Sequence, residues 1–101
     1  MSSYFEDFTD EEYAKYSELF NYNTELEDGK IRVWGGEDSY LILVKHNEDI
    51  YIEVDECEGM FFEDGDNIYY TDPVWWTKLN DLDQLVEDVK NSVELCYSEY
   101  Q

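Results

Sequence analysis

The chain has 101 residues, and its 27 Asp and Glu against 6 Lys and Arg give a formal net charge of -21. This length predicts one acidic domain over residues 1–101, and six scattered cations cannot form the basic surface that direct nucleic-acid binding needs. No run of about 18 apolar residues predicts a membrane span, and the N-terminal residues lack the basic and apolar segments of a signal peptide, so we expect a cytoplasmic protein.

The aromatic content indicates that the chain folds despite its charge. Hydrophobic residues make up 43% and aromatic residues 18%, which is typical of a packed domain and not of a disordered acidic segment. The carboxylates are spread from Glu6 to Glu99, so we expect an acidic shell in which mutual repulsion raises carboxylate pKa values. Cys57 and Cys96 are too few for a disulfide framework and form no C-x-x-C pair, so both are expected as buried thiols.

A first helix is expected over residues 10–20. Thr9 and Glu12 fit a capping box, in which each side chain accepts a hydrogen bond from the other residue's backbone amide. Helical spacing then defines a buried face, made of Tyr13, Tyr16 and Phe20.

After an expected loop over residues 21–29, the hydrophobic period changes to two, which predicts β-strands. Five strands of an antiparallel meander are expected, at residues 30–33, 40–44, 50–54, 60–62 and 68–70, with a turn at Gly35–Gly36. In the third strand, Ile50, Ile52 and Val54 should face the core, whereas Tyr51, Glu53 and Asp55 should face solvent.

The sheet should end at Asp72–Pro73, because proline lacks the amide hydrogen of a strand ladder. Trp75–Trp76 is then expected to close the core between sheet and helix, or alternatively to offer aromatic anchors to a partner. A second helix, capped by Asn80 or Asp81, should carry an apolar stripe from Leu82 through Val93 and Cys96 to about residue 98. The order of helix, meander and helix predicts an α+β domain with the helices on one face of the sheet.

No pattern in the sequence predicts catalysis, a cofactor or a metal site. His46 is the only histidine and has no identifiable nucleophile partner, and the acidic loops lack the spacing of calcium ligands. Glu37 and Asp38 follow the glycine pair and would repel a phosphate. At this acid content, paired carboxylates occur by chance, so we expect a protein that is not an enzyme.

The density of charge is the informative feature. A domain of this length has a diameter of roughly 35 Å, and an equal length of duplex DNA carries roughly 20 charges, close to the net -21 of the chain. Carboxylates four apart on a helix or two apart on a strand are separated by about 6 Å, which approximates the phosphate step along one DNA strand. The carboxylates expected to imitate phosphates are Glu48, Asp49, Glu53, Asp55, Glu56, Glu58, Glu63, Asp64, Asp66, Asp83, Glu87 and Glu94.

In size, charge and dispersion of carboxylates, the whole chain resembles the DNA-mimic inhibitors of phages and mobile elements, a class that includes anti-restriction, anti-CRISPR and glycosylase-inhibitor proteins. The class shares neither a motif nor a fold. The resemblance implies an inhibitor that occupies the nucleic-acid channel of a basic enzyme in a bacterial host cell. Two alternatives stay open: an immunity or antitoxin protein that neutralises a basic nuclease, and an ordinary protein whose acidic shell reflects adaptation to high salt.

Overall fold

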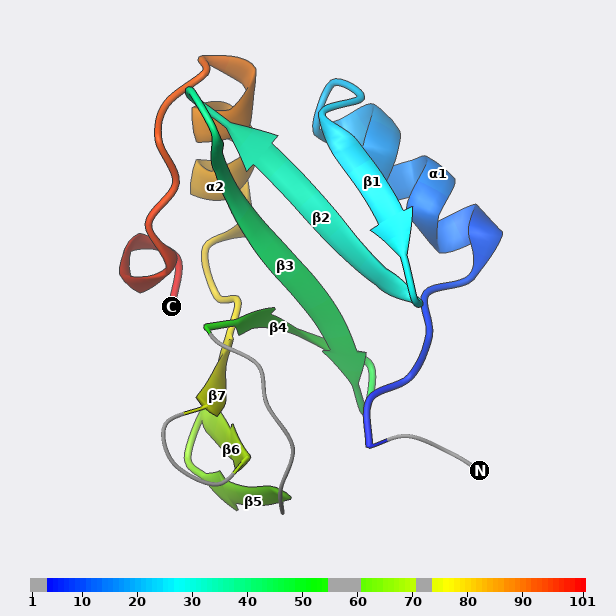
Figure 1. The fold of residues 1–101 in the computed structure, drawn as a ribbon, viewed down its shortest axis with the longest axis vertical. Helices are drawn as coiled ribbons and strands as arrows, with labels where there is room; N and C mark the ends of the chain where they lie inside the picture. The colour runs from blue at the N-terminus through cyan, green and yellow to red at the C-terminus, as the bar shows by residue number, and fades with distance from the viewer. Residues whose placement is uncertain (1–3, 55–60, 71–73) are drawn as a thin grey trace.

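The protein forms two α-helices and one large sheet in the residues that its computed structural model describes, which are 4–54, 61–70 and 74–101 (Figure 1). The elements are α1 (Asp10–Leu19), β1 (Thr24–Glu27), β2 (Lys30–Gly35), β3 (Ser39–His46), β4 (Asp49–Glu53), β5 (Phe61–Asp64), β6 (Asn67–Tyr70), β7 (Val74–Lys78), α2 (Leu82–Lys90) and a 3-10 helix η1 (Tyr97–Glu99). The expected α+β class is confirmed. The expected number of strands is wrong, because the described residues contain seven strands and not five.

The seven strands form a single antiparallel sheet in the order β1-β2-β3-β4-β7-β6-β5. Consecutive strands pair from β1 to β4 and again from β5 to β7, so each half of the sheet is a meander. The halves join where β7 pairs with β4, with Glu53 opposite Trp76 and Ile52 opposite Thr77. The chain therefore leaves β4 for the far edge of the sheet and returns strand by strand to its centre.

Two strands lie where none was expected. β1 falls within the expected loop 21–29, and its sequence has a single hydrophobic residue, Leu26, which packs against the core. β7 falls on the expected bridge after Pro73, beyond the point where the sheet was expected to end. A proline cannot donate within a ladder, but it does not keep the residues after it out of the sheet. Asp72 and Pro73 themselves lie outside the described residues.

The first helix begins and packs as the sequence predicts. The Glu12 amide donates to Thr9 Oγ1 at 3.1 Å, and the Thr9 amide donates to Glu12 Oε1 at 2.9 Å, which completes the capping box. Phe20 is fully buried at the end of the helix, and Tyr13 and Tyr16 pack partly buried against the same core. The buried face predicted for α1 is thus confirmed.

The second helix also begins at the expected place. The Asp81 side chain accepts a hydrogen bond from the Gln84 amide at 3.1 Å, so Asp81, one of the two expected caps, is the N-cap. Leu85 and Val89 are fully buried, and Leu82 and Val86 pack beside them at the edge of the core. The apolar stripe is therefore confirmed within α2.

The expected end of this helix near residue 98 is wrong, because α2 ends at Lys90. Ser92 adopts a positive φ of 56°, and the next amide, that of Val93, donates to the Asp88 carbonyl at 2.9 Å. The Ser92 amide donates to the Val89 carbonyl at 3.2 Å, so the two bonds form a Schellman end. Glycine usually occupies the position of Ser92, and its absence left the sequence without a stop signal.

After α2, residues 93–95 pack against the end of β2 and the start of β3. A Cβ placed on Gly35 would lie 2.6 Å from the Val93 carbonyl oxygen and 2.7 Å from Leu95 Cγ, so Gly35 allows a close approach of two segments as well as preceding a turn. Val93 is 43% exposed and Cys96 is exposed, so their expected burial is wrong. Cys57 lies outside the described residues.

The C-terminal residues lock the start of α2. Tyr100 is fully buried, its hydroxyl donates to Asp88 Oδ2 at 2.5 Å, and its carbonyl accepts from the amides of Asn80 and Asp81 at 2.8 and 3.0 Å. Gln84 Nε2 donates to the other Asp88 oxygen at 2.8 Å, so this buried carboxylate has both oxygens hydrogen-bonded. The last turn of the protein is thus part of its core.

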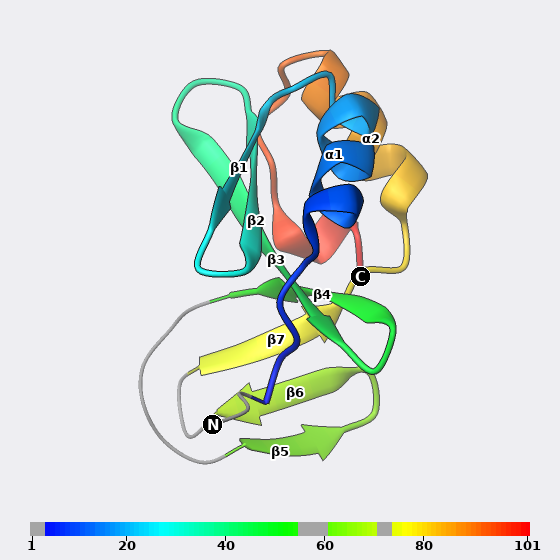
Figure 2. The same cartoon turned by 90° about the vertical axis from the view of Figure 1, so that its right-hand side faces the viewer.

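Two hydrophobic clusters lie on opposite faces of the sheet. Leu43 and Val44, neighbours on β3, point to opposite faces as strand geometry requires. Leu43 joins the larger cluster, to which both helices contribute, and Figure 2 shows α1 and α2 on the same side of β1–β3. Val44 joins the smaller cluster with Ile68 and Trp76. Trp76, which is 3% exposed, is therefore a core residue, but it packs on the face opposite the helices and not between sheet and helix as expected.

Burial of tyrosines predicts a loss of stability in alkaline solution. Desolvation is the main cause that raises the pKa of Tyr4 to about 12 and raises the pKa values of Tyr16, Tyr51 and Tyr100. Tyrosine in an unfolded chain ionises near about pH 10, so these groups favour the folded state below that pH and the benefit is lost as pH rises through their folded values. We expect the melting temperature to fall steeply between about pH 10 and 12, with part of the tyrosinate absorbance appearing only on unfolding. Complete tyrosine ionisation in a chain with native circular dichroism would contradict this expectation.

Candidate partner-binding surface

A short N-terminal segment, residues 4–8, ties together several turns at one side of the sheet. The Phe8 amide donates to the Gly29 carbonyl in the β1–β2 turn at 3.0 Å, and the Glu6 amide donates to the Lys45 carbonyl near the end of β3 at 2.8 Å. The Tyr4 hydroxyl donates to Glu63 Oε1 on β5 at 2.6 Å. We name this segment the N-terminal strap. It joins the two halves of the sheet on this side.

The strap and the turns that it contacts all carry carboxylates. Glu6 Oε1 accepts from the Asn47 amide of the β3–β4 turn at 2.8 Å, and Asp7 contacts Gly29 in the β1–β2 turn. Lys78 at the end of β7 contacts both the β3–β4 and the β5–β6 turn, because its Nζ lies 3.6 Å from Asp49 Oδ2 and its amide donates to the Asp66 carbonyl at 2.9 Å, and Figure 2 shows the two turns on the same side of the sheet. We define the acidic edge as the exposed carboxylates of the strap and of these three turns: Glu6, Asp7, Glu27, Asp28, Glu48, Asp49, Glu63, Asp64 and Asp66.

Tight turns hold these carboxylates in place. Asp28 and Gly29, between paired Glu27 and Lys30, have φ values of 53° and 77°. Asn47 and Glu48, between β3 and β4, have φ values of 49° and 72°. Two consecutive left-handed residues are typical of the two-residue hairpin turn whose twist matches that of the strands. The charges at the tips are therefore fixed by short backbone connections instead of flexible loops.

The cations of the chain neutralise little of this surface. Of the 23 carboxylates in the described residues, 20 belong to exposed residues. Four of the six cations form ion pairs: Lys30 with Glu53 at 3.0 Å, Arg32 with Glu27 at 3.3 Å, Lys45 with Glu12 at 2.8 Å and Lys78 with Asp49 at 3.6 Å. Of these four pairs, those of Glu27 and Asp49 involve the acidic edge, and His46 Nε2 lies 3.0 Å from Glu63 Oε1; the other acidic-edge residues are exposed without an ion pair to a described residue.

The expected position of Glu53 on an outer, solvent-exposed face is wrong. Its side chain is 2% exposed, and its Oε1 accepts from Trp76 Nε1 at 2.7 Å and from Lys30 Nζ at 3.0 Å. Tyr51, expected to face solvent on the same strand, is also buried. Both residues were expected to point outward because the second face of the sheet was expected to be solvated. In the structure, aromatic residues of β5–β7 and of the strap pack on that face. Glu53 is thus an internal partner of a tryptophan and a lysine.

Substitutions of Glu53 are therefore expected to lower the free energy of unfolding. Replacing Glu53 with leucine leaves the buried Trp76 indole N–H without its acceptor, which costs about 2 kcal/mol of unfolding free energy. Glu53→Gln keeps an acceptor oxygen and loses only the ion pair with Lys30, which costs about 1 kcal/mol because the lysine side chain is 35% exposed and can be hydrated. Urea denaturation of both variants measures the difference. Equal stability of Glu53→Leu and the native chain would show that the indole bond contributes nothing.

The structure brings some of the expected phosphate-like residues together and separates others. Glu48, Asp49, Glu63, Asp64 and Asp66 meet on the acidic edge, and the electrostatic influence of Asp49, Glu63 and Asp66 on the Tyr51 pKa reflects their common neighbourhood. A second group is exposed on or after α2, a helix that Figure 1 shows at the opposite end of the molecule from β5 and β6: Asp83, Glu87 and Glu94. Glu94 lies beyond the helix, so the expected single helical face of that group is wrong. Asp55, Glu56 and Glu58 lie outside the described residues.

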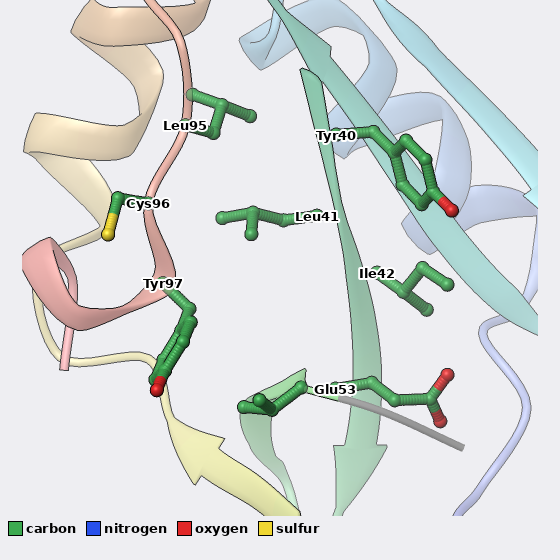
Figure 3. Close-up of a pocket in the computed structure, with 8 residues that line it drawn as sticks. Tyr40, Leu41, Ile42, Glu53, Leu95, Cys96 and Tyr97 are labelled. Atoms are coloured by element: carbon green, nitrogen blue, oxygen red, sulfur yellow. The ribbon is translucent and has the colours of Figure 1, made fainter. Parts of the chain in front are cut away.

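A cleft lies between the sheet and the C-terminal residues. Figure 3 shows a cleft of about 480 Å³ between β3 and residues 95–97, where Leu41 points toward Leu95 and the Glu53 carboxylate points away from Cys96. Within the described ranges, no three His, Cys, Asp or Glu side chains converge in a way that could hold a metal ion. No helix in those ranges has the length and apolar character needed to cross a membrane.

Comparison of the chain with models of protein families, with curated proteins and with solved structures found no match.

Sequence reasoning missed four members of the acidic edge. Glu6 and Asp7 precede the first expected helix and were assigned to no element, and Glu27 and Asp28 lie in the expected loop over residues 21–29. Asp28–Gly29 is a strong signal for a two-residue hairpin turn, and it could have placed Glu27 and Asp28 at a tip. Nothing in the local sequence of Glu6 indicates that it would cap the β3–β4 turn, because that contact joins residues 41 positions apart.

Hydrogen bonds reverse the expected shift of two carboxylate pKa values. A hydrogen bond from Lys45, together with the backbone bond to Thr9, lowers the pKa of Glu12. Hydrogen bonds from Tyr4 and His46 lower the pKa of Glu63. The expectation that repulsion raises carboxylate pKa values is therefore wrong at these two positions. Both pairings favour the folded state above about pH 4.5 and lose that effect as pH falls through the lowered values.

Proposed function

We propose that the protein is a DNA-mimic inhibitor that occupies the nucleic-acid channel of a DNA-processing or defence enzyme, of the restriction or CRISPR type. The observation that carries the proposal is the acidic edge, where four separate segments of the chain present carboxylates on one side. A channel that binds phosphates by Lys and Arg side chains would attract such an array for the same electrostatic reason that it attracts a nucleic acid.

The dimensions of the protein support this proposal. Its longest extent is 36 Å and its net charge is -21. A duplex of that length carries roughly 20 phosphate charges, so the protein could replace a similar length of DNA in charge as well as in size. The tight turns also favour binding, because charges held in fixed positions lose little conformational entropy when they are bound.

Competition with DNA tests the proposal. The partner would be recovered from a bacterial lysate at low salt and eluted by rising salt, and then mixed with the protein and its duplex substrate in a gel-shift assay. We expect mutually exclusive binding, and inhibition that weakens with salt because the Debye length shortens to about 8 Å at physiological ionic strength.

Two other results of this experiment would overturn the proposal. A stable ternary complex of protein, enzyme and duplex would favour the immunity reading, in which the protein binds beside the channel. If no basic nucleic-acid enzyme is recovered and the protein folds only at high salt, the acidic shell is better explained as an adaptation to salt. Folding at low salt would exclude the salt-adaptation hypothesis and leave the DNA-mimic and immunity hypotheses.

A further inference from the structure

A row of aromatic rings crosses the outer half of the sheet on one face. Phe62 on β5 lies opposite Tyr69 on β6, and Tyr69 lies opposite Trp75 on β7. Residues directly opposite in neighbouring strands share a face, so the three rings form a cross-strand row. Ring centroids are 5.1 Å apart for Phe62 and Tyr69 and 5.8 Å apart for Tyr69 and Trp75, and Tyr97 of η1 continues the row 6.1 Å beyond Trp75.

The two faces of this half-sheet differ in their cover. On one face, Phe61, Tyr70 and Trp76 are packed beneath the aromatic residues of the N-terminal strap, Tyr4 and Phe5. The row lies on the other face, and neither α1 nor α2 lies over β5–β7 in Figure 2. Phe62 is 55% exposed, and Tyr69, Trp75 and Tyr97 are partly exposed. The row is therefore an aromatic surface that the described part of the chain leaves partly open.

Carboxylates of the acidic edge adjoin one end of the row. Asp64 follows Phe62 by two residues on β5, so it lies on the same face and about 6.6 Å further along the strand. Asp66 lies in the turn of the same hairpin, whereas Glu63 points to the opposite face, where it accepts from Tyr4. A cationic side chain drawn toward Asp64 would pass over the exposed rings. The negative charge beside the row therefore favours a partner that contacts the rings with cationic side chains.

Arginine is the side chain that matches both features. Its planar guanidinium stacks on aromatic faces and is less strongly hydrated than the ammonium of lysine. The protein already contains this contact, since the Arg32 guanidinium carbon lies 4.8 Å from the ring centroid of Tyr40 and 5.8 Å from that of Trp34. We propose that the row of Phe62, Tyr69, Trp75 and Tyr97 binds arginine side chains of the partner's basic surface, an inference that rests on the proposed function and adds a chemical preference to it.

Binding of octa-arginine and octa-lysine peptides, measured by calorimetry at fixed ionic strength, tests the inference on the intact protein. Both peptides should bind through charge, and octa-arginine should bind about tenfold more tightly because several rings add cation–π contacts. Phe62→Leu keeps an apolar side chain of similar size but removes the ring, and it should weaken octa-arginine binding about threefold while leaving octa-lysine binding unchanged. Phe62→Leu combined with Tyr69→Leu should remove most of the preference.

A matched control is Tyr22→Leu, which removes a tyrosine that is 72% exposed and outside the row. It should preserve the tenfold preference. Equal binding of the two peptides by the native protein, or an unchanged preference in Phe62→Leu, would overturn the inference. Phe62 is exposed on an edge strand, so this variant should fold, and a melting curve checks that it does. The peptide assay contains no enzyme, so its failure is distinct from a failure of competition with DNA.

Discussion

Replacing Leu85 with alanine is expected to lower the free energy of unfolding by about 3 kcal/mol. Leu85 is fully buried, and it joins α2 to the cluster that contains Ile31, Val33 and Leu43 of the sheet. The cost combines the lost transfer of the side chain from water with the cavity left behind, since a packed interior relaxes only in part. Urea denaturation followed by circular dichroism measures this change.

A charge-changing variant on the same helix provides the control. Glu87 is exposed on α2, so Glu87→Gln should change the unfolding free energy by less than about 0.5 kcal/mol. If Leu85→Ala and Glu87→Gln melted at the same temperature, the orientation of α2 described here would be wrong.

Removing four charges from the acidic edge is expected to weaken inhibition of the partner by about 100-fold, since long-range steering and close charge pairs both contribute. The proposed set, Asp28→Asn, Glu48→Gln, Asp64→Asn and Asp66→Asn, avoids the carboxylates that bind Tyr4, Arg32, His46 and Lys78. Asn–Gly suits the β1–β2 turn as well as Asp–Gly does, so the backbone at Asp28 should be kept. The inhibition constant, measured at fixed salt against the recovered enzyme, gives the result.

A second set of four amides separates position from total charge. Asp83→Asn, Glu87→Gln, Glu94→Gln and Glu99→Gln also change the net charge from -21 to -17, but these residues lie on or after α2. This set should weaken inhibition only severalfold, through the reduced long-range field. Equal loss in both sets would assign binding to the total charge, and a larger loss in the second set would place the partner on the α2 face. Melting curves should show both sets folded.

Local chemistry was sufficient for the elements whose signals are short-ranged. The Thr9–Glu12 capping box, the Asp81 cap and the buried stripe at Leu85 and Val89 each depend on residues within one or two helical turns. The β5–β6 hairpin likewise follows from two aromatic runs around an acidic turn. The net charge and the dominance of acidic surface are also properties of the sequence alone. These features define the class of fold and the negative sign of the electrostatic field around the protein.

Tertiary contacts decided the features that separate this protein from a simple helix–meander–helix domain. β7 enters the centre of the sheet because β4 offers it an open edge, which no local pattern around Trp75 indicates. The same pairing buries Glu53, since Trp76 and Lys30 arrive from strands distant in the chain. Glu53 therefore changed from an expected surface charge to an internal hydrogen-bond acceptor.

The same distinction explains the acidic edge. The sequence by itself determined that the surface would be acidic, because 27 carboxylates cannot be buried or paired by six cations. Only the fold decided which carboxylates share one side, because the N-terminal strap joins turns that are far apart in the chain through the bonds of Tyr4, Glu6 and Phe8. Composition sets the total charge, whereas long-range hydrogen bonds and strand pairing set its distribution in space.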